Sequence, residues 1–390
     1  MMGPARSRYN VFVREKWGRG AIATLLASLC CLAIAAPVRA DEQFDVGPSP
    51  VLNVQMNRGH LTIQTWDRPQ VQIVSDQPMD VQHLAPEQVD PRMPKQLQIS
   101  SEEIQTQHGR VALPAESFVL PELPGTQHDA IVARGGGNVT ITIPRNTAMV
   151  LAHVRAGHLS LNGYHGVFVA HSRGAGIELN NVSGTGFVES LRGRVVATNS
   201  SFDRLRMRTA TGNMLFQGCT SHQIQATSTY GSIVYDNGHF QPGLARFESE
   251  HGNVALGVRG GAQIGAHSGS GHVISSFHNN GAHVRGDPAT KQATVDGGGP
   301  VVTATSKNGS VYLYSGSMNE HPHVREELNG STRLPVRYPS AEPPQYYAPM
   351  PAVQSRPQPP PRSQAPRAQP FPPREAMPHP ARHPGRPPLR

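Results

Sequence analysis

The sequence predicts an all-β protein, a single-chain parallel β-helix or β-solenoid with rungs of roughly 19 residues. One observation is a segment of the form Gly-x-apolar-x-apolar that recurs every 18 to 21 residues. Another is a Ser or Thr that stands three residues before the leading glycine in rung after rung. A fixed period of this length is typical of repeat proteins, in which no rung can bury its own apolar face and all rungs stack.

The leading residue of each rung is called its anchor. The anchors are Gly157, Ala175, Gly193, Gly212, Gly231, Gly252, Gly271 and Gly309. The last step is 38 residues, twice the usual spacing. This step predicts that an insertion, Phe277 to Gly299, replaces one rung and covers part of one end of the stack.

Side chains along each rung alternate as they do in β-strands. In the rung anchored at Gly212, Met214 and Phe216 face one way and Leu215 faces the other. The next strand places Ile224 and Ala226 inward. Asn-Gly, Asn-Asn and Asn-Ser pairs follow the first strand at matching places, and such residues accept the left-handed backbone of a corner. Inward aliphatic and aromatic side chains then form one continuous core, each contributing roughly 1.5–3 kcal/mol.

Residues 1–40 have the order of a secretory signal peptide. Five basic residues precede an apolar run from Ala21 to Ala36, and Pro37-Val-Arg-Ala40 offers small residues before a cleavage site. The alternative is a membrane anchor, for which this run is short. We therefore expect export to a periplasm, a cell surface or the medium, and no transmembrane span in the mature chain.

Residues 41–135 are predicted to form an N-terminal β segment with irregular loops, a candidate cap for one end of the solenoid. Val51–Gln55 and Leu61–Thr65 alternate apolar and polar side chains, and we interpret them as paired strands joined by a turn at Arg58-Gly59. Prolines interrupt residues 76–135 repeatedly. The solenoid itself is expected over 136–314. An ordinary β-sandwich also spaces short strands evenly, but it gives no reason for an in-phase Ser/Thr-x-x-Gly repeat.

The motifs resemble a family of bacterial exported β-solenoid domains known as the "putative adhesin" family. The resemblance is carried by Gly59-His-Leu-Thr-Ile-Gln-Thr-Trp-Asp67, by Ile141-Thr-Ile-Pro144, by the repeated Ser/Thr-x-x-Gly, and by the closing Thr305-Ser-Lys-Asn-Gly-Ser-Val-Tyr-Leu313. It implies a non-enzymatic solenoid of the bacterial envelope and supplies no catalytic set. The irregular segment at 76–135 and the proline-rich end depart from the family pattern.

The charge is unevenly distributed along the chain. The formal charge of +8 divides into +5 for residues 1–40, −4 for 41–332 and +7 for 333–390. The predicted folded body is mildly acidic, so the high isoelectric point gives no reason to expect nucleic-acid binding.

Arginines give the one candidate ligand site. Alternation places Arg204, Arg206 and Arg208 on the outward side of one strand, with Arg192 and Arg194 near the preceding anchor. Such a stripe can bind anionic envelope polymers or an acidic envelope protein. The alternative is a solvated outer face, because the neighbouring rung offers Gln223, Gln225 and Thr227 instead of further charge.

The other reactive residues indicate neither a metal, a cofactor nor an enzyme. The closest histidine pair is His321-Pro-His323, which has no carboxylate or cysteine at ligand spacing. Cys219 is the one thiol after the leader and is expected to be inert. Acidic residues in the rungs are sparse and spread out, whereas a glycan-cleaving β-helix needs converging carboxylates.

Residues 315–390 are predicted to form a disordered, proline- and arginine-rich tail. Nineteen prolines and almost no aliphatic residues occur from Pro335 onward. The tail is either a basic spacer that contacts anionic envelope polymers or a plain linker. The whole chain is thus expected to be a structural, adhesive or partner-binding element. A polysaccharide-acting β-helix enzyme and a self-assembling scaffold are the alternatives, and the sequence leaves the oligomeric state open.

Overall fold

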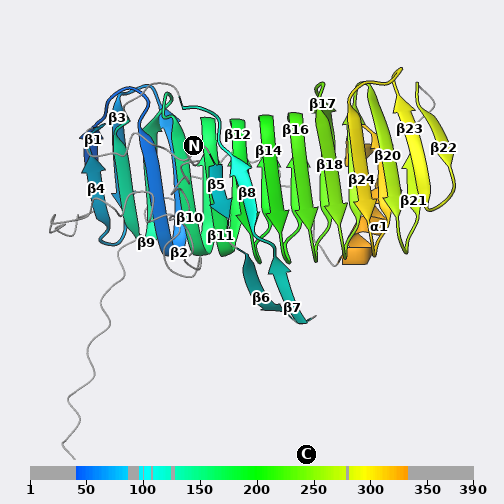
Figure 1. Cartoon of the computed structure of the whole chain (residues 1–390), viewed down its shortest axis with the longest axis horizontal. Helices are drawn as coiled ribbons and strands as arrows, with labels where there is room; N and C mark the ends of the chain where they lie inside the picture. The colour runs from blue at the N-terminus through cyan, green and yellow to red at the C-terminus, as the bar shows by residue number, and fades with distance from the viewer. Residues whose placement is uncertain are drawn as a thin grey trace, which may run out of the picture. The chain divides into compact units, whose positions relative to one another are not determined.

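The computed structural model describes residues 41–86, 96–99, 101–106, 109–123, 128–277 and 281–332. The predicted leader and the proline-rich stretch from Pro335 lie outside these residues. Within them, the strands form one continuous 21-stranded sheet and two separate two-stranded sheets. Successive rungs pair in parallel, which confirms the predicted β-solenoid (Figure 1).

Each rung contributes to two β-layers that face each other across the core. In four rungs one long strand passes through both layers: β9 (Ala130–Pro144), β2 (Val51–Trp66), β10 (Met149–Asn162) and β11 (His165–Asn180). In the others the first layer holds β12 (Ser183–Ser190), β14 (Ser201–Thr209), β16 (Thr220–Ser228), β18 (Leu244–Ser249), β24 (Val301–Ser306) and β20 (Ala262–Ser268). The second layer holds β13 (Val195–Thr198), β15 (Met214–Gln217), β17 (Ile233–Phe240), β19 (Val254–Arg259), β25 (Val311–Ser315) and β21 (Val273–Ser276).

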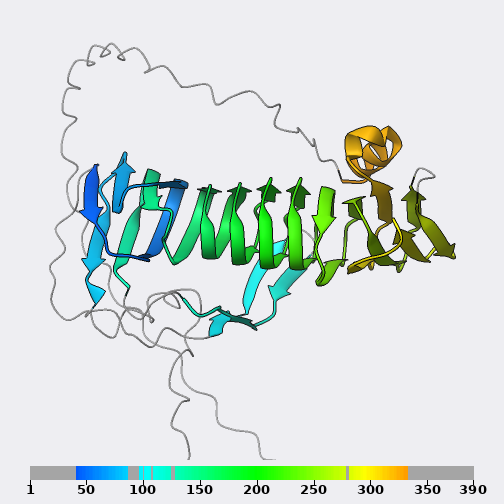
Figure 2. The ribbon, with the colours of Figure 1, turned by 90° about the horizontal axis from the view of Figure 1, so that it is seen from above.

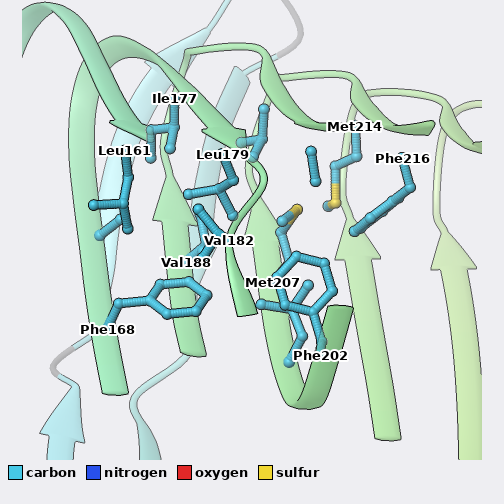
Figure 3. Packing of buried hydrophobic residues seen from close by; sticks show 14 of the residues in the cluster. Leu161, Phe168, Ile177, Leu179, Val182, Val188, Phe202, Met207, Met214 and Phe216 are labelled. Carbon is cyan, nitrogen blue, oxygen red and sulfur yellow. The ribbon is translucent and has the colours of Figure 1, made fainter. Parts of the chain in front are cut away.

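The core lies between the layers and follows the predicted alternation. Figure 3 shows Phe168 and Met207 of the first layer pointing toward Leu179, Met214 and Phe216 of the second. These side chains are fully buried, and Leu215 faces the opposite way into a different cluster, as expected. Among the predicted corner residues, Asn181, Asn199 and Asn237 have φ angles near +50°.

Anchor glycines and the preceding hydroxyls together build the bend between the layers. A Cβ on Gly193 would lie 1.7 Å from the carbonyl oxygen of Ala175 in the adjacent rung, so only glycine fits there. Ser190 Oγ accepts a hydrogen bond from Gly193 N–H at 2.8 Å and donates one to its carbonyl oxygen at 3.1 Å. The Ser/Thr-x-x-Gly repeat is therefore a buried hydrogen-bonding device that holds the bend.

The stacking order departs from the chain order at the C-terminal end. The rung of β24 and β25 lies between the β18–β19 rung and the β20–β21 rung. A Cβ on Gly309 would lie 2.4 Å from Gly252 O, and one on Gly271 would lie 2.6 Å from Gly309 O. The expectation that an insertion replaces a rung is wrong. The chain instead turns back, because β23 (Thr290–Val295) already pairs with the outer edge of β20.

The N-terminal strand also enters the stack out of order. Val51–Trp66 is one 16-residue strand, not the expected pair joined at Arg58-Gly59. It pairs in parallel with β9 on one edge and β10 on the other, and Gly59 aligns with the anchors Gly137 and Gly157. Glycine is required at position 59 as it is at Gly193, because a Cβ there would lie 1.8 Å from Gly137 O. A residue interpreted as a turn is therefore an anchor.

Antiparallel strands cover the N-terminal end of the described stack and, at the other end, the outer edge of the first layer. At the N-terminal end, β3 (Gln70–Ser75) and β4 (Asp80–Leu84) pair with β9, and β1 (Glu42–Asp45) pairs with β3. At the other end β23 pairs with β20, and β22 (His283–Gly286) pairs with β23. The insertion of residues 277–299 thus lies at an end of the solenoid. Capping the open edges removes backbone groups that would template pairing with another chain.

Two further elements cover parts of the outer faces. The lateral cover consists of β5 (Gln96–Ile99), β6 (Glu102–Thr106), β7 (Gly109–Leu113), β8 (Glu116–Val119) and the described residues up to 123. It packs on the first layer, where its Leu97, Ile99 and Phe118 meet outward apolar side chains. The C-terminal cover consists of the 3₁₀ turn η4 (Met318–Glu320) and α1 (Pro322–Thr332), which pack on the second layer. Figure 2 shows the two covers on opposite sides of the stack.

The helix corrects one part of the tail prediction. Disorder was expected from residue 315, but Met318, Val324 and Leu328 are buried against outward side chains of the second layer. One apolar residue of η4 and two on one side of α1 suffice for docking, although the segment is polar on average. The helices among the described residues are too short and too polar to cross a membrane.

Candidate functional site

A line of charged and imidazole side chains runs across four rungs on the outer face of the first layer. The strand register aligns His153, His171, Glu189 and Arg208, one from each of β10, β11, β12 and β14. Each of the last three stands directly before the buried Ser or Thr of its rung, so it faces outward. Neighbouring strands are about 4.8 Å apart, which brings successive side chains of the line into contact.

The contacts within the line are short. His153 Nδ1 and His171 Nδ1 are 2.7 Å apart, and their rings stack with centroids 4.6 Å apart. On its other side His171 Nε2 lies 3.1 Å from Glu189 Oε1. Arg208 Nε donates a hydrogen bond to Glu189 Oε2. The line is therefore a connected network, and we call it with Glu102 and Glu116 the outer-face cluster.

Residues of the lateral cover, which lies on the outer face of the first layer, complete this cluster. Glu102 of β6 places Oε1 3.5 Å from His171 Nε2. Glu116 of β8 accepts from Arg208 Nη1 at 3.2 Å and pairs with Arg206. Arg208 Nη1 also donates to the Pro114 carbonyl oxygen at 2.6 Å. Segments far apart in the sequence thus meet at one buried polar site.

Burial sets the charge states at this site. The cover leaves His171 1% exposed and Glu189 0% exposed. Burial, and then the adjacent His171, lower the pKa of His153 to about 3, so His153 is neutral at ordinary pH. Burial raises the pKa of Glu102, while His171 opposes this rise and the like charge of Glu189 adds to it. Arg208, which bonds to Glu189, also opposes the rise in the pKa of Glu102.

The residues of this cluster have the donor atoms of a metal centre. One ligand atom from each of Glu102, His171 and Glu189 lies within 4.8 Å of the other two. Glu189 Oε1 is buried and accepts no hydrogen bond. An imidazole nitrogen with two carboxylate oxygens is a donor set that suits divalent first-row transition metals.

The five arginines predicted as a ligand site have different surroundings. Arg204 and Arg194 are exposed, and Arg192, also exposed, donates through Nη2 to the Gln105 carbonyl oxygen at 2.6 Å. Arg206 is half-buried and Arg208 is buried. All three arginines of β14 point outward as expected, but β8 covers Arg206 and Arg208 and neutralises them with Glu116. A ligand role for the five stays a prediction.

The histidine pair His321 and His323 bonds to neighbouring residues of the fold, and the thiol of Cys219 is buried. His321 Nε2 lies 2.8 Å from the Ser315 carbonyl oxygen, and His323 Nε2 lies 2.7 Å from Ser276 Oγ. The two rings thus bond to different partners. Cys219 is buried, and burial raises the pKa of its thiol to about 11, which keeps it protonated.

The outward residues of single strands did not reveal the cluster, because its members occupy equivalent positions in neighbouring rungs. The signal was present in the residue before each Ser or Thr, which is His171, Glu189 and Arg208 in three successive rungs. Glu102 lies about 70 to 90 residues away from its partners, outside the repeat. Nothing in its local sequence indicates which rung it meets.

Together, these features define a class: a two-layered, end-capped β-solenoid whose outer faces are partly covered. Comparison with known families assigns the chain within that class. The family model Toastrack DUF4097 matches residues 96–313, more than half of the chain, so the chain belongs to the Toastrack family. The matched residues begin at β5, so they include the lateral cover as well as the rungs from β9 to β25.

Comparison with individual proteins adds one structure. The chain is similar to a crystal structure described as that of a "putative cell adhesion protein" from Clostridium sporogenes ATCC 15579, at 12% sequence identity. The similarity covers 72% of this chain and 100% of that one, with a TM-score of 0.17. None of the curated proteins compared with the chain matches it.

Proposed function

We propose that the protein is an exported, non-enzymatic β-solenoid that acts as an adhesive or partner-binding element of a bacterial envelope. The observation that carries this proposal is the part of the first layer that the lateral cover leaves uncovered, which we call the open face. Its outward residues include Arg204, Gln223, Gln225, Thr227, Leu244, Arg246, Glu248, Gln263, His267, Val301, Thr303 and Thr305.

Two exposed apolar side chains lie side by side at one edge of the open face. Leu244 is 62% exposed and Val301 is 52% exposed, and these first residues of β18 and β24 are direct neighbours in the register. The amides Gln223 and Gln263 flank the pair in the adjacent rungs. A sheet face that combines exposed apolar residues with arginines and amides fits a protein or glycan partner.

Charge on the open face favours an anionic partner. Arg204 is exposed, and the guanidinium of Arg246 lies 2.6 Å from Glu248, a pair that is itself largely solvent-exposed. Residues 333–390 add +7 to the same chain. Anionic envelope polymers, or an acidic envelope protein, therefore match the surface better than a neutral one.

The two alternatives receive less support. A polysaccharide-acting enzyme requires two carboxylates that flank a substrate, whereas Glu189 is fully buried and Glu102, which belongs to β6, points from the cover onto the same histidine. A scaffold that stacks end to end requires open parallel edges, whereas antiparallel strands cover β9 at one end of the described stack and β20 at the other. A single-copy binding module is the function that this geometry favours.

Sedimentation with purified cell wall, together with binding to an anionic polysaccharide, tests the proposal. In the full chain, replacing Arg204, Leu244 and Val301 together by Ser should weaken binding by about tenfold or more, about 1.4 kcal/mol. The matched control is Val74→Ser, which changes an exposed valine of β3 at the N-terminal end. Equal binding by all three proteins, or new reducing ends in the polysaccharide, would contradict the proposal.

A further inference from the structure

We propose that Glu102, His171 and Glu189 bind one divalent transition-metal ion, with Zn²⁺ as the best match, and that this ion fastens the lateral cover to the solenoid. The proposed site is separate from the open face and does not depend on the function proposed for that face. It joins β6 of the cover to β11 and β12, two adjacent rungs of the first layer.

The separations between donor atoms fit a tetrahedral ion. Zinc lies about 2.0–2.1 Å from imidazole nitrogen and about 2.0–2.2 Å from carboxylate oxygen, so neighbouring ligand atoms of a tetrahedral site are about 3.3 Å apart. His171 Nε2 is 3.1 Å from Glu189 Oε1 and 3.5 Å from Glu102 Oε1. Both separations lie close to that value, and the third, between the oxygens of Glu102 and Glu189, is within 4.8 Å. Three protein ligands leave a fourth position for water.

A second observation points to a cation at the same place. Glu189 Oε1 is fully buried, makes no hydrogen bond and yet lies at contact distance from a ring nitrogen. The 2.7 Å contact between His153 Nδ1 and His171 Nδ1 requires a proton between these two atoms. When His171 carries that proton in its neutral form, its Nε2 lone pair faces two carboxylates. A metal ion among the three donors would bond to the buried Glu189 Oε1, which makes no hydrogen bond.

The surrounding residues already form the outer shell that a metal centre needs. Ligating histidines usually bond through their other ring nitrogen, and ligating carboxylates are usually hydrogen-bonded themselves. His153 occupies the second nitrogen of His171, and Arg208 Nε holds Oε2 of Glu189. The charge of the two carboxylates matches that of the ion, and Glu116 pairs with both Arg208 and Arg206.

The alternative occupant is a proton. An imidazolium at His171 would also bridge Glu102 and Glu189, with no metal present. The two states differ in stoichiometric metal affinity and in the effect of the metal on stability. Both can be measured on the full chain after dialysis against a chelator.

The first experiment titrates Zn²⁺ into the full chain in competition with a chromophoric chelator. We expect one tight equivalent, and Glu102→Gln should weaken it by at least about 100-fold, since outer-shell changes alone cost about 10–100-fold. Glu103→Gln is the matched control, because its exposed carboxylate lies next in the same strand and pairs with Arg110. Zn²⁺ should raise the unfolding temperature of the wild type and of E103Q but not of E102Q.

The second experiment needs no variant, so a misfolded mutant cannot leave the proposal untested. The X-ray absorption spectrum of the Zn²⁺-loaded wild type should show four nitrogen or oxygen ligands, of which one is an imidazole. The proposal is overturned by the absence of a tight equivalent, by equal affinity in E102Q and E103Q, or by a spectrum with several imidazoles from surface histidines.

Discussion

The outer faces of the two layers are covered in opposite halves of the solenoid and by different kinds of element. In the first layer, the lateral cover packs over β10, β11 and β12, while β16, β18, β24 and β20 face solvent. In the second layer, the C-terminal cover packs over β15, β17, β19 and β25, while the outward residues of β10 and β11 stay partly exposed. A β segment and a helix thus both bury outward apolar side chains of a layer.

What the two covers share is the chemistry of the outward residues beneath them. Under the lateral cover the outward positions include Leu151, Val169 and Phe187, and farther along the same register line they become Gln225 and Arg246. In the second layer the order is reversed: Ser160 and Glu178 lead to Leu215, Val234 and Tyr312. Outward apolar residues in consecutive rungs therefore mark where a solenoid face needs a partner segment.

The largest expected difference in stability is between substitutions at two positions on one register line of the first layer. Phe187 is buried with its ring centroid 5.6 Å from that of Phe118, so Phe187→Ala should destabilise by about 3–5 kcal/mol. Arg246→Ala, on the open face, should change stability by less than about 1 kcal/mol. Urea denaturation measures both, and amide exchange of β5 and β8 should speed up in F187A alone. Similar midpoints would show that the cover does not pack as described.

A smaller effect is expected for the C-terminal cover. Leu328→Ala removes a buried side chain, but a terminal helix can undock, so the cost should be about 2 kcal/mol, near the lower limit for such changes. Glu326→Ala, on the exposed side of the same helix, is the control. Loss of exchange protection in α1 should accompany the L328A change. If both variants unfold at the wild-type midpoint, α1 contributes nothing to the fold.

The smallest expected loss of stability is for a substitution in the uncovered half of the second layer. His158 Nε2 lies 3.4 Å from Glu178 Oε2, and both side chains are partly exposed. The hydrogen bond to Glu178 raises the pKa of His158 against the opposing effect of burial, and the same bond lowers the pKa of Glu178. For such an exposed pair Glu178→Gln should cost only about 0.2–1 kcal/mol.

The pH dependence of that pair has a definite sign. The glutamate contribution is present above its ordinary pKa and is lost as pH falls through its lowered value. The histidine contribution is complete below its ordinary pKa of 6.5 and is lost as pH rises through its raised value. The cost of E178Q should therefore be full between about pH 4.5 and 6.5 and should vanish well above that window. A cost that is the same at pH 5.5 and pH 9 would contradict this assignment.

Much of the architecture could be predicted because it is set locally and repeats. The anchor glycines, the hydroxyl three residues earlier and the alternation around Met214 and Phe216 all depend on contacts between equivalent positions of neighbouring rungs. The order of the rungs at the two ends could not be predicted in this way. Gly309 and Gly271 carry the same anchor motif, so the motif alone does not decide which of them stacks on Gly252, and in the structure β23 pairs with the outer edge of β20.

The candidate site was less accessible to sequence reasoning. Arg208 was predicted to face outward, and it does, but exposure was inferred from direction alone. Its burial depends on Glu116 and Pro114, which precede it by more than 90 residues and contact it only after the cover has docked. Outward apolar residues such as Val169 and Phe187 were the available signal that a cover exists. The identity of the covering segment requires the fold.

Thiol labelling along one register line tests the division of the first layer most directly. Val169 and Arg246 belong to the line that also contains Phe187, Arg206 and Gln225. In a background with Cys30→Ser and Cys31→Ser, and with the native Cys219 buried, Val169→Cys and Arg246→Cys each supply one reactive thiol. We predict fast labelling of R246C and slow labelling of V169C, limited by opening of the lateral cover. Equal labelling rates would contradict a covered and an open half on the same face.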